Sequence, residues 1–339
     1  MEIKELKIAG YKSLADITLV NPNAFSVFVG ANAAGKSNIF EALQFFNYCN
    51  NVRAYEVIKM FGGIEDIHNF SNFIHNLHNI KIVVELIQAT PNVTLFTNDK
   101  LNTWGVSILE WGLSQQKIAK EDLEKWLTFE DLQHLANFTR IFVGNKNISK
   151  TSNTDDSKLA ADASNLERVL KRILKDEGTR NEIIEILQLL IPGIDKVEIA
   201  TEPLSGSDNL LIYENNFQKP LPKRLISDGT YNIIAIITAI FQSDTPQFLC
   251  IEEPENGLNP KVLKVLVNII REKCKEKGHF IWLNTHSQSI VAELTVDEII
   301  LVDKKGGNTH IKQIQGLELN GLRMDEALLT NALGGGIAW

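Results

Sequence analysis

The sequence predicts an α/β fold in which a mixed sheet is flanked by helices and carries a compact helical insertion. An apolar run at 25–29 leads into a glycine-containing loop, and helical spacing follows from residue 38. A second apolar run, 248–251, ends in two acidic residues, and a third, 279–284, follows an amphipathic segment at 261–275. Strand-length apolar runs that alternate with helical segments in this way indicate an α/β chain.

The loop after the first apolar run has the P-loop pattern, which binds phosphate. Its glycines, Gly30 and Gly35, let the backbone wrap round an anion, so that N–H groups and the helix N-terminus face it. Lys36 is expected to reach the β- and γ-phosphates of a nucleoside triphosphate, and Ser37 to ligate Mg²⁺. An incidental strand-to-helix turn is the alternative, and the flanking segments disfavour it. The expected nucleotide-binding residues of the loop are Gly30, Asn32, Ala33, Ala34, Gly35, Lys36, Ser37 and Asn38.

The second apolar run ends in Glu252 and Glu253, far downstream of the loop. Consecutive acids at a strand end suit a site in which one carboxylate holds the Mg²⁺ shell and the next polarises an attacking water. We assign Glu252 to the metal and Glu253 to the water. The alternative, a strand that happens to end in acids before a proline-containing turn, is disfavoured once the P-loop is present. The expected cofactors are therefore ATP and Mg²⁺.

Three further segments carry a family resemblance. The acids continue into Pro-Glu-Asn-Gly-Leu-Asn-Pro at 254–260, the third apolar run ends in Thr-His-Ser at 285–287, and the chain opens with a strand and turn at 3–14. In combination these motifs resemble the ATPase heads of the ABC superfamily, specifically the soluble branch that contains the SMC, RecF and overcoming-lysogenization-defect (OLD) proteins. The resemblance covers about the first 45 residues and roughly 220–315.

The resemblance implies further site residues. His286 would be a catalytic switch histidine that senses the γ-phosphate, and Lys12 would approach the nucleotide phosphates. Asn32 and Asn38 match the family's habit of placing Asn within and just after the P-loop. The family usually has Asp where this chain has Glu252, and the longer side chain is expected to change the Mg²⁺ geometry or slow turnover. The implied D-loop consists of Asn256, Gly257 and Leu258.

The family also needs a signature segment, which a second head presents to the nucleotide across a dimer interface. The candidate lies at 225–230, just before a predicted helix at 231–241. Ser227 and Gly229 would supply a hydroxyl and close-approaching N–H groups, with the helix N-terminus adding positive potential. The alternative is a plain N-cap, in which Ser227 or Asp228 starts a buried helix. One capped terminus can serve both purposes. In the dimer that the resemblance implies, ATP holds two heads together and hydrolysis opens them.

The motifs divide the chain into an N-terminal ATPase lobe at 1–90, an inserted lid at 91–220 and a C-terminal ATPase lobe at 221–339. Gln88, after a predicted strand, is the candidate for the family's Q-loop glutamine, which touches Mg²⁺, and only its position after the strand supports the assignment. Residues 144–157 have the composition of an exposed loop. Because no heptad run is sustained, the insertion is expected to be a compact helical lid. Strands are predicted at 81–88, just before the lid, and at 104–111 within it, and its predicted helices are 115–127, 129–138, 165–175 and 180–190.

Composition excludes some classes of protein. The longest apolar stretch, near 233–241, is about half of what a membrane span needs, and the N-terminus reads as a strand and not as a signal peptide. Cys49, Cys250 and Cys274 are widely separated, so neither a disulfide framework nor a metal cluster is indicated, and a cytoplasmic location is expected. The formal charge of −8 argues against a broadly basic nucleic-acid binder.

The sequence contains two clusters of basic residues and one cluster of histidines, and for each of them a structural role is preferred to a binding role. The basic groups read first as solvated helix faces, with a phosphate-tracking surface as the minority view. The histidines lack a cysteine or close acid to complete a metal set, so a surface segment is preferred. The groups are Lys171, Arg172 and Lys175; Arg271, Lys273, Lys275 and Lys277; and His68, His75 and His78.

The C-terminal segment carries strands at 298–303 and 309–314 and an amphipathic helix at 324–333. OLD nucleases continue into a Toprim domain, and this sequence shows no such second catalytic centre, so an effector is expected to come from another chain. Trp339 is expected to tuck onto the core or, as the second choice, to dock a partner.

The predicted function is therefore an ATP-binding and hydrolysing ABC-type switch that dimerises head to head and controls a separate effector, with defence against phage or plasmids as the expected role. The alternative is a RecF- or SMC-like DNA-repair ATPase. A transporter subunit is disfavoured by the weak signature match and the large insertion.

Overall fold

A six-stranded sheet forms the centre of the molecule, seen in a computed structural model that describes residues 3–51, 54–69, 80–86, 91–92, 110–111, 137–143, 156–319 and 321–330. Its strand order is β14-β13-β3-β12-β11-β7, and all neighbouring pairs are parallel except β13 with β14. The strands are β3 (Phe25–Val29), β7 (Phe138–Ile141), β11 (Phe248–Glu252), β12 (Phe280–Thr285), β13 (Ile299–Lys305) and β14 (Asn308–Gln313).

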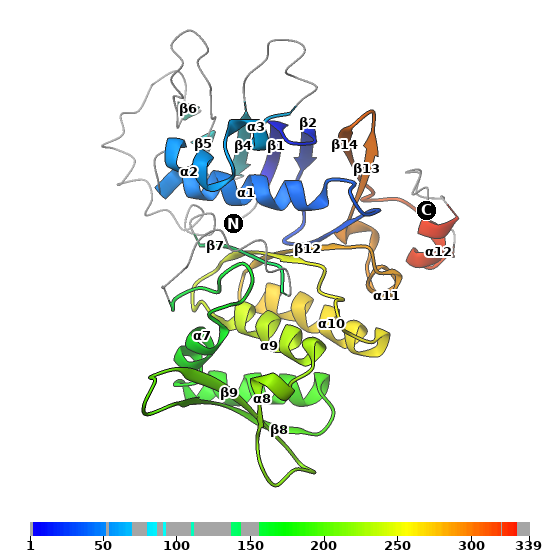
Figure 1. Ribbon diagram of the computed structural model, residues 1–339. Helices are drawn as coiled ribbons and strands as arrows, with labels where there is room; N and C mark the ends of the chain where they lie inside the picture. The colour runs from blue at the N-terminus through cyan, green and yellow to red at the C-terminus, as the bar shows by residue number, and fades with distance from the viewer. Residues whose placement is uncertain are drawn as a thin grey trace.

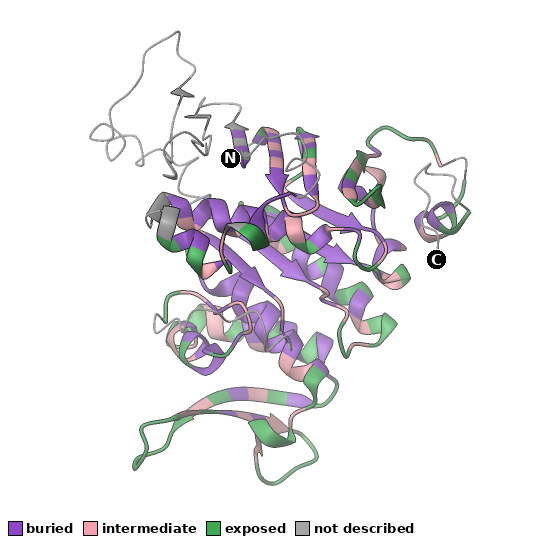
Figure 2. Ribbon diagram, turned by 45° about the horizontal axis from the view of Figure 1, so that its top comes forward, coloured by how far each residue is buried: buried purple, intermediate pink, exposed green. Residues whose placement is uncertain are grey.

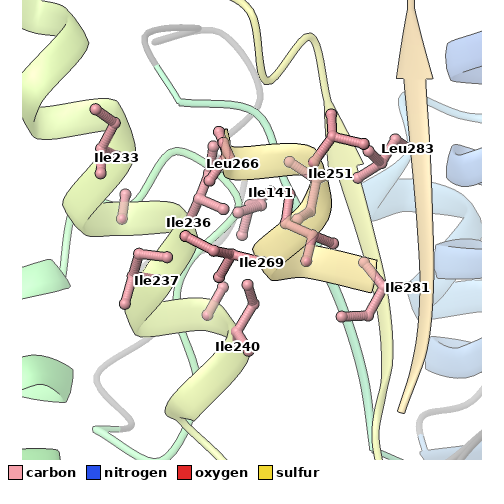
Figure 3. Close-up of a cluster of buried hydrophobic side chains, with 14 of the residues drawn as sticks. Ile141, Ile233, Ile236, Ile237, Ile240, Ile251, Leu266, Ile269, Ile281 and Leu283 are labelled. Atoms are coloured by element: carbon pink, nitrogen blue, oxygen red, sulfur yellow. The ribbon is translucent and has the colours of Figure 1, made fainter. Parts of the chain in front are cut away.

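Two hydrophobic cores lie on opposite faces of this sheet, because successive side chains of a strand point to opposite sides. On one face, aliphatic residues of β3, β11 and β12 pack against α9 (Asp228–Phe241) and α10 (Pro260–Glu276), as Figure 3 shows for Ile251, Ile281 and Leu283. On the other face, the rings of Phe28, Phe248 and Trp282 pack together. The centroid of the Trp282 ring lies 5.2 Å from that of Phe28 and 4.8 Å from that of Phe248.

The aromatic face is covered by α1 (Lys36–Asn51) and a three-stranded antiparallel sheet of order β2-β1-β4 (Figure 1). Its strands are β1 (Ile3–Tyr11), β2 (Leu14–Val20) and β4 (Lys81–Leu86). The short helices α2 (Ala54–Met60) and α3 (Ile64–Ile67) follow α1. This arrangement confirms the predicted α/β fold with a mixed sheet and flanking helices.

A third sheet, of order β10-β9-β8, lies with α7 and α8 on the far side of α9 from the central sheet (Figure 1). Its β8 and β9 mix buried, intermediate and exposed residues, whereas every residue of β3, β11 and β12 in the central sheet is buried (Figure 2). The elements are α7 (Leu166–Ile173), α8 (Glu177–Leu190), β8 (Ile194–Thr201), β9 (Asp208–Glu214) and β10 (Leu221–Pro222). The remaining short elements are β5 (Pro91–Asn92), β6 (Glu110–Trp111), α11 (Gln288–Val291) and α12 (Met324–Leu329), with 3₁₀ turns at Lys223–Leu225 and Val296–Glu298.

The insertion is only partly as predicted. The expected helices 165–175 and 180–190 are confirmed as α7 and α8. Phe138, expected to end a helix, instead begins β7, a strand of the central sheet, and the β8–β9 hairpin was not predicted. The division at residues 90 and 220 stays a prediction. Most of the predicted strand 104–111, the helix 115–127, nearly all of 129–138 and of the loop 144–157, His75, His78, Gln88 and Trp339 lie outside the described residues.

Elsewhere the predicted elements are confirmed within a few residues. The predicted helices 231–241 and 261–275 correspond to α9 and α10, and the segment near 324–333 begins as α12. His68 is buried and forms an isolated bridge with Tyr11, so this part of the histidine segment is not at the surface. Among the described helices, none has both the length and the apolarity that crossing a bilayer requires.

Substitution of Trp282 tests the aromatic core. Its side chain is fully buried between Phe28 and Phe248, so Trp282→Ala is expected to lower the free energy of unfolding by about 3–5 kcal/mol. Urea denaturation measures the change. The control is Leu204→Ala, which removes a side chain that is 98% exposed and is expected to change stability by less than about 0.5 kcal/mol. Equal effects of the two substitutions would contradict the assigned core.

Candidate functional site

The site lies at the carboxyl edge of the central sheet, where parallel strands bring distant motifs together. Strand β3 leads into the P-loop, β11 ends at Glu252, and β12 ends at Thr285. In the register of these strands Glu252 is opposite Asn284, and Thr285 is opposite Val29. The phosphate loop, the acids and the residues around His286 are therefore neighbours although up to about 250 residues separate them in sequence.

The P-loop has the tight backbone expected of it. Ala33 and Gly35 have φ angles of 62° and 104°, and a Cβ at Gly35 would lie 2.0 Å from Oγ1 of Thr309. The Thr309 hydroxyl donates a hydrogen bond of 2.8 Å to the carbonyl oxygen of Ala34 and contacts the Ser13 hydroxyl at 2.7 Å. Strand β14 and the turn between β1 and β2 thus hold the outside of the loop. Thr309 was not identified from the sequence, because its role depends on a contact 275 residues away.

Lys36 points back into the loop. Its ammonium group donates to the carbonyl oxygens of Gly30 and Ala31 at 2.7 and 2.9 Å. Burial lowers the pKa of Lys36, and the negative charges of the nearby acids Glu253, Glu255 and Glu252 oppose that shift. A cation surrounded by loop carbonyls at a helix N-terminus is suited to a phosphate ligand.

Glu252 is buried, and both of its carboxylate oxygens have hydrogen-bond or ion-pair partners. The Ser37 hydroxyl donates to its Oε2 at 2.5 Å, and the Asn284 amide donates to the same oxygen at 3.1 Å. The Arg140 guanidinium forms an ion pair with the other oxygen, Oε1. A serine hydroxyl beside a carboxylate oxygen is an oxygen donor set of the kind Mg²⁺ prefers, so the residues fit the expected metal. Arg140 was not identified from the sequence, since nothing there places β7 beside β11.

Glu253 adopts a left-handed conformation with φ of 45° at the end of β11. Its N–H donates to the backbone oxygen and to Oδ1 of Asn284, at 3.0 and 3.1 Å. Its side chain is only partly buried, and Oε2 accepts a hydrogen bond of 3.2 Å from Asn256 of the D-loop. This backbone conformation is sparsely populated for residues other than glycine, and it marks the point where the chain leaves β11.

His286 lies next to Glu255, a residue for which no role was predicted. Oε1 of Glu255 accepts from the Thr285 hydroxyl at 2.6 Å and from the His286 N–H at 3.1 Å. The imidazole Nδ1 lies 3.4 Å from the same oxygen, and the ring is 40% exposed. Glu255 therefore fixes the backbone that carries His286 and leaves its ring accessible.

The candidate signature segment begins α9 and contacts the D-loop of the same chain. Ser227 is the N-cap, and its hydroxyl accepts from the Thr230 N–H at 3.1 Å. A Cβ at Gly229 would lie 2.3 Å from the carbonyl oxygen of Gly257, so the two loops touch backbone to backbone. The buried Asn232 amide donates to the carbonyl oxygens of Pro254 and Asn256 at 3.3 and 3.0 Å. The N-cap reading is confirmed, and a role in a second chain's site stays a prediction.

A cleft of about 650 Å³ lies beside this contact. Phe142 and Val143, directly after β7, form part of its wall, and Asp162 and Ser164 form another part. Its signature and D-loop walls are made by Asp228, Tyr231, Asn232, Asn256 and Gly257, and Lys223 completes it. The cleft therefore joins the insertion to the two loops that the family resemblance puts at a dimer interface.

The remaining predicted residues have varied surroundings. Lys12, with φ of 46°, forms a 2.6 Å ion pair with Glu41 of α1. Asn38 donates to the Ser13 hydroxyl at 2.8 Å, and Asn32 is exposed. Strand β4, which precedes Gln88, pairs with β1 and is not part of the central sheet. The position next to β11 in the central sheet is occupied by β7.

The fold and the site define an ABC-type ATPase of the SMC/RecF-like group. The chain belongs to the family described as "AAA domain, putative AbiEii toxin, Type IV TA system", whose model matches residues 25–292. A putative ABC transporter ATP-binding protein of Pyrococcus abyssi is 40% identical over 77 residues, which are 23% of this chain and 28% of that protein. The chain thus matches little more than a quarter of that relative's length.

Two solved SMC head structures share the fold. An Smc head domain with an extended coiled coil, bound to the C-terminal domain of ScpA derived from Pyrococcus furiosus, has a TM-score of 0.54 at 15% identity, with 98% of this chain and 99% of that chain covered. An Smc head bound to the C-winged helix domain of ScpA has a TM-score of 0.51 at 17% identity, with 92% and 97% covered. At these identities the likeness concerns the fold alone.

Substitution of Gly229 tests the contact between the signature segment and the D-loop. The added methyl of Gly229→Ala would meet the Gly257 carbonyl oxygen at 2.3 Å, so the free energy of unfolding is expected to fall by about 1–3 kcal/mol. The control is Gly178→Ala in the first turn of α8, where the nearest atom is 3.5 Å away and no loss is expected. Thermal or urea denaturation compares them, and an unchanged stability of Gly229→Ala would argue against the contact.

Proposed function

We propose that the chain is an ATP-dependent switch that binds and hydrolyses ATP, pairs head to head with a second copy when ATP is bound, and controls a separate effector protein. The observation that carries the proposal is the 2.5 Å hydrogen bond between Ser37 of the P-loop and Glu252 at the end of β11. It joins the phosphate-binding and acidic motifs into one site, as phosphoryl transfer requires.

The residues of the site have separate roles in this proposal. The ammonium group of Lys36, which now contacts two loop carbonyls, would turn to the β- and γ-phosphates. Ser37 and Glu252 would hold Mg²⁺, which supplies positive charge to the phosphate oxygens when bound. Glu253 would orient the attacking water and accept its proton, because it directly follows Glu252 and its side chain is partly exposed. His286, with its ring accessible, would contact the γ-phosphate and sense its loss.

Head-to-head pairing would complete the site with groups from a second copy. Ser227 is exposed at the N-terminus of the 14-residue helix α9, where free N–H groups and the helix dipole favour an anion. Gly257 of the D-loop, which touches Gly229, is exposed on the same part of the chain. A nucleotide bound to one copy would therefore meet the signature segment and the D-loop of the other.

The proposed biological role is control of an effector in defence against phage or plasmids. The family description names a toxin and a toxin–antitoxin system, which supports a switched effector more than a repair clamp. A cytoplasmic location is part of the proposal. It is supported by Cys49, Cys250 and Cys274, which are free and buried as in a reducing compartment.

The alternative, a DNA-binding repair ATPase, draws less support from the basic residues. Arg172 donates to the backbone oxygens of residues 156, 157 and 242, and Lys171 pairs with Asp208. In the second group Arg271 pairs with Glu298, and Lys273 with Glu182 and Glu276. Charges engaged within the chain are less available to neutralise phosphates.

A water-orienting role for Glu253 predicts that Glu253→Gln binds ATP, does not hydrolyse it and accumulates as a dimer. Light scattering with ATP and Mg²⁺ measures the mass. Ser227→Arg added to this variant would place a bulky side chain at the proposed interface and should return it to monomer with ATP binding unchanged. A Glu253→Gln protein that stays monomeric with ATP bound would contradict head-to-head pairing.

Control of an effector predicts that Glu253→Gln, purified with ATP from a host that carries the neighbouring genes, co-elutes with a stoichiometric protein. The matched control is Lys36→Ala, which is expected to lose ATP and the partner together. Co-elution of nucleic acid without protein, with binding that weakens steeply as salt rises, would favour the DNA clamp instead.

A further inference from the structure

Arg140 contacts Glu252, the proposed metal ligand, from the edge of the central sheet. It lies on β7, the edge strand of the central sheet, opposite Cys250 of β11. Its Nε donates to Oε1 of Glu252, and its Nη1 donates to the side-chain oxygen of Gln44 on α1 at 3.1 Å. The Arg140 side chain is 6% exposed and that of Glu252 is 1% exposed. The pair is therefore out of water and has a fixed orientation.

The two oxygens of Glu252 have different partners. Oε1 is held by Arg140, whereas Oε2 accepts from Ser37 and Asn284. Arg140 is thus placed to fix the orientation of the carboxylate, with one oxygen on the arginine and the other facing Ser37. A guanidinium suits this purpose, because its planar fork can donate to Glu252 and Gln44 at the same time.

We propose that Arg140 is a positioning residue for Glu252: it holds Oε1 and so presents Oε2, alone, to Ser37 and to a divalent cation. This inference rests on the proposed function of the site. It also accounts for glutamate at position 252, because the longer side chain lets one carboxylate contact Arg140 on the edge side and Ser37 on the P-loop side. An aspartate, one methylene shorter, would not span both.

The test separates metal binding from nucleotide binding. A non-hydrolysable ATP analogue is titrated in EDTA, and Mn²⁺, which is visible by electron paramagnetic resonance, is then titrated into the protein–analogue complex. For Arg140→Met we expect analogue affinity in EDTA within about twofold of wild type and Mn²⁺ affinity about tenfold weaker, since loss of an orienting partner typically weakens metal binding by 10–100-fold. A purely structural role would weaken both affinities together and would overturn the inference.

Two further variants complete the test. Arg140→Lys keeps the charge without the planar fork and is expected to weaken Mn²⁺ binding severalfold, which keeps the inference testable if Arg140→Met does not fold. Glu252→Asp should weaken Mn²⁺ binding by itself, and adding Arg140→Met should weaken it no further, because the aspartate no longer reaches the arginine. Additive losses, or Mn²⁺ affinity within twofold of wild type in the folded arginine variants, would overturn the inference. A wild-type chain that binds no analogue in EDTA or with metal would overturn the proposed function, and the inference with it.

Discussion

The pairing of β11 with β12 is the constraint on which the rest of the site depends. Because the strands are parallel and Glu252 is opposite Asn284, the Asn284 side chain reaches both acids: it donates to Oε2 of Glu252 and accepts from the N–H of Glu253. A slip of one residue would turn every side chain of a strand to the other face and would exchange aliphatic and aromatic core positions. The two packed cores therefore fix the register, and the register fixes the distance between the acids and the P-loop.

The sequence predicted what depends on local pattern. The loop at 30–37, the acids at 252–253 and the segment at 285–287 each have a short-range signature. Continuous apolar runs, separated by helical segments, indicated the strands that carry them. The N-cap at Ser227 was also readable, because capping uses residues within one turn. Interactions that cross the sheet left no such signal: Arg140 and Thr309 acquire their partners only when β7 and β14 lie beside other strands.

The insertion was harder to predict for a physical reason. Strand β7 has four residues, all buried, and a short buried run does not distinguish a strand from a helix by periodicity. In β8 the two buried positions, Ile194 and Val197, are separated by the charged residues Asp195 and Lys196, and Lys196 forms an ion pair with Glu198. Helices α7 and α8 were predicted well because each has enough turns for its apolar stripe to repeat.

The hydrogen bond from Thr309 to Ala34 makes the nucleotide loop depend on the last strand of the central sheet. Strand β14 also binds the first hairpin, since the Gln313 side chain pairs with both the N–H and the carbonyl oxygen of Val20. A chain shortened just before β14 would retain every sequence motif for ATP, yet the Ala34 carbonyl would lose its Thr309 donor and Val20 of β2 would lose its Gln313 partner. The smallest unit able to fold into a competent phosphate loop is therefore longer than the span of its motifs.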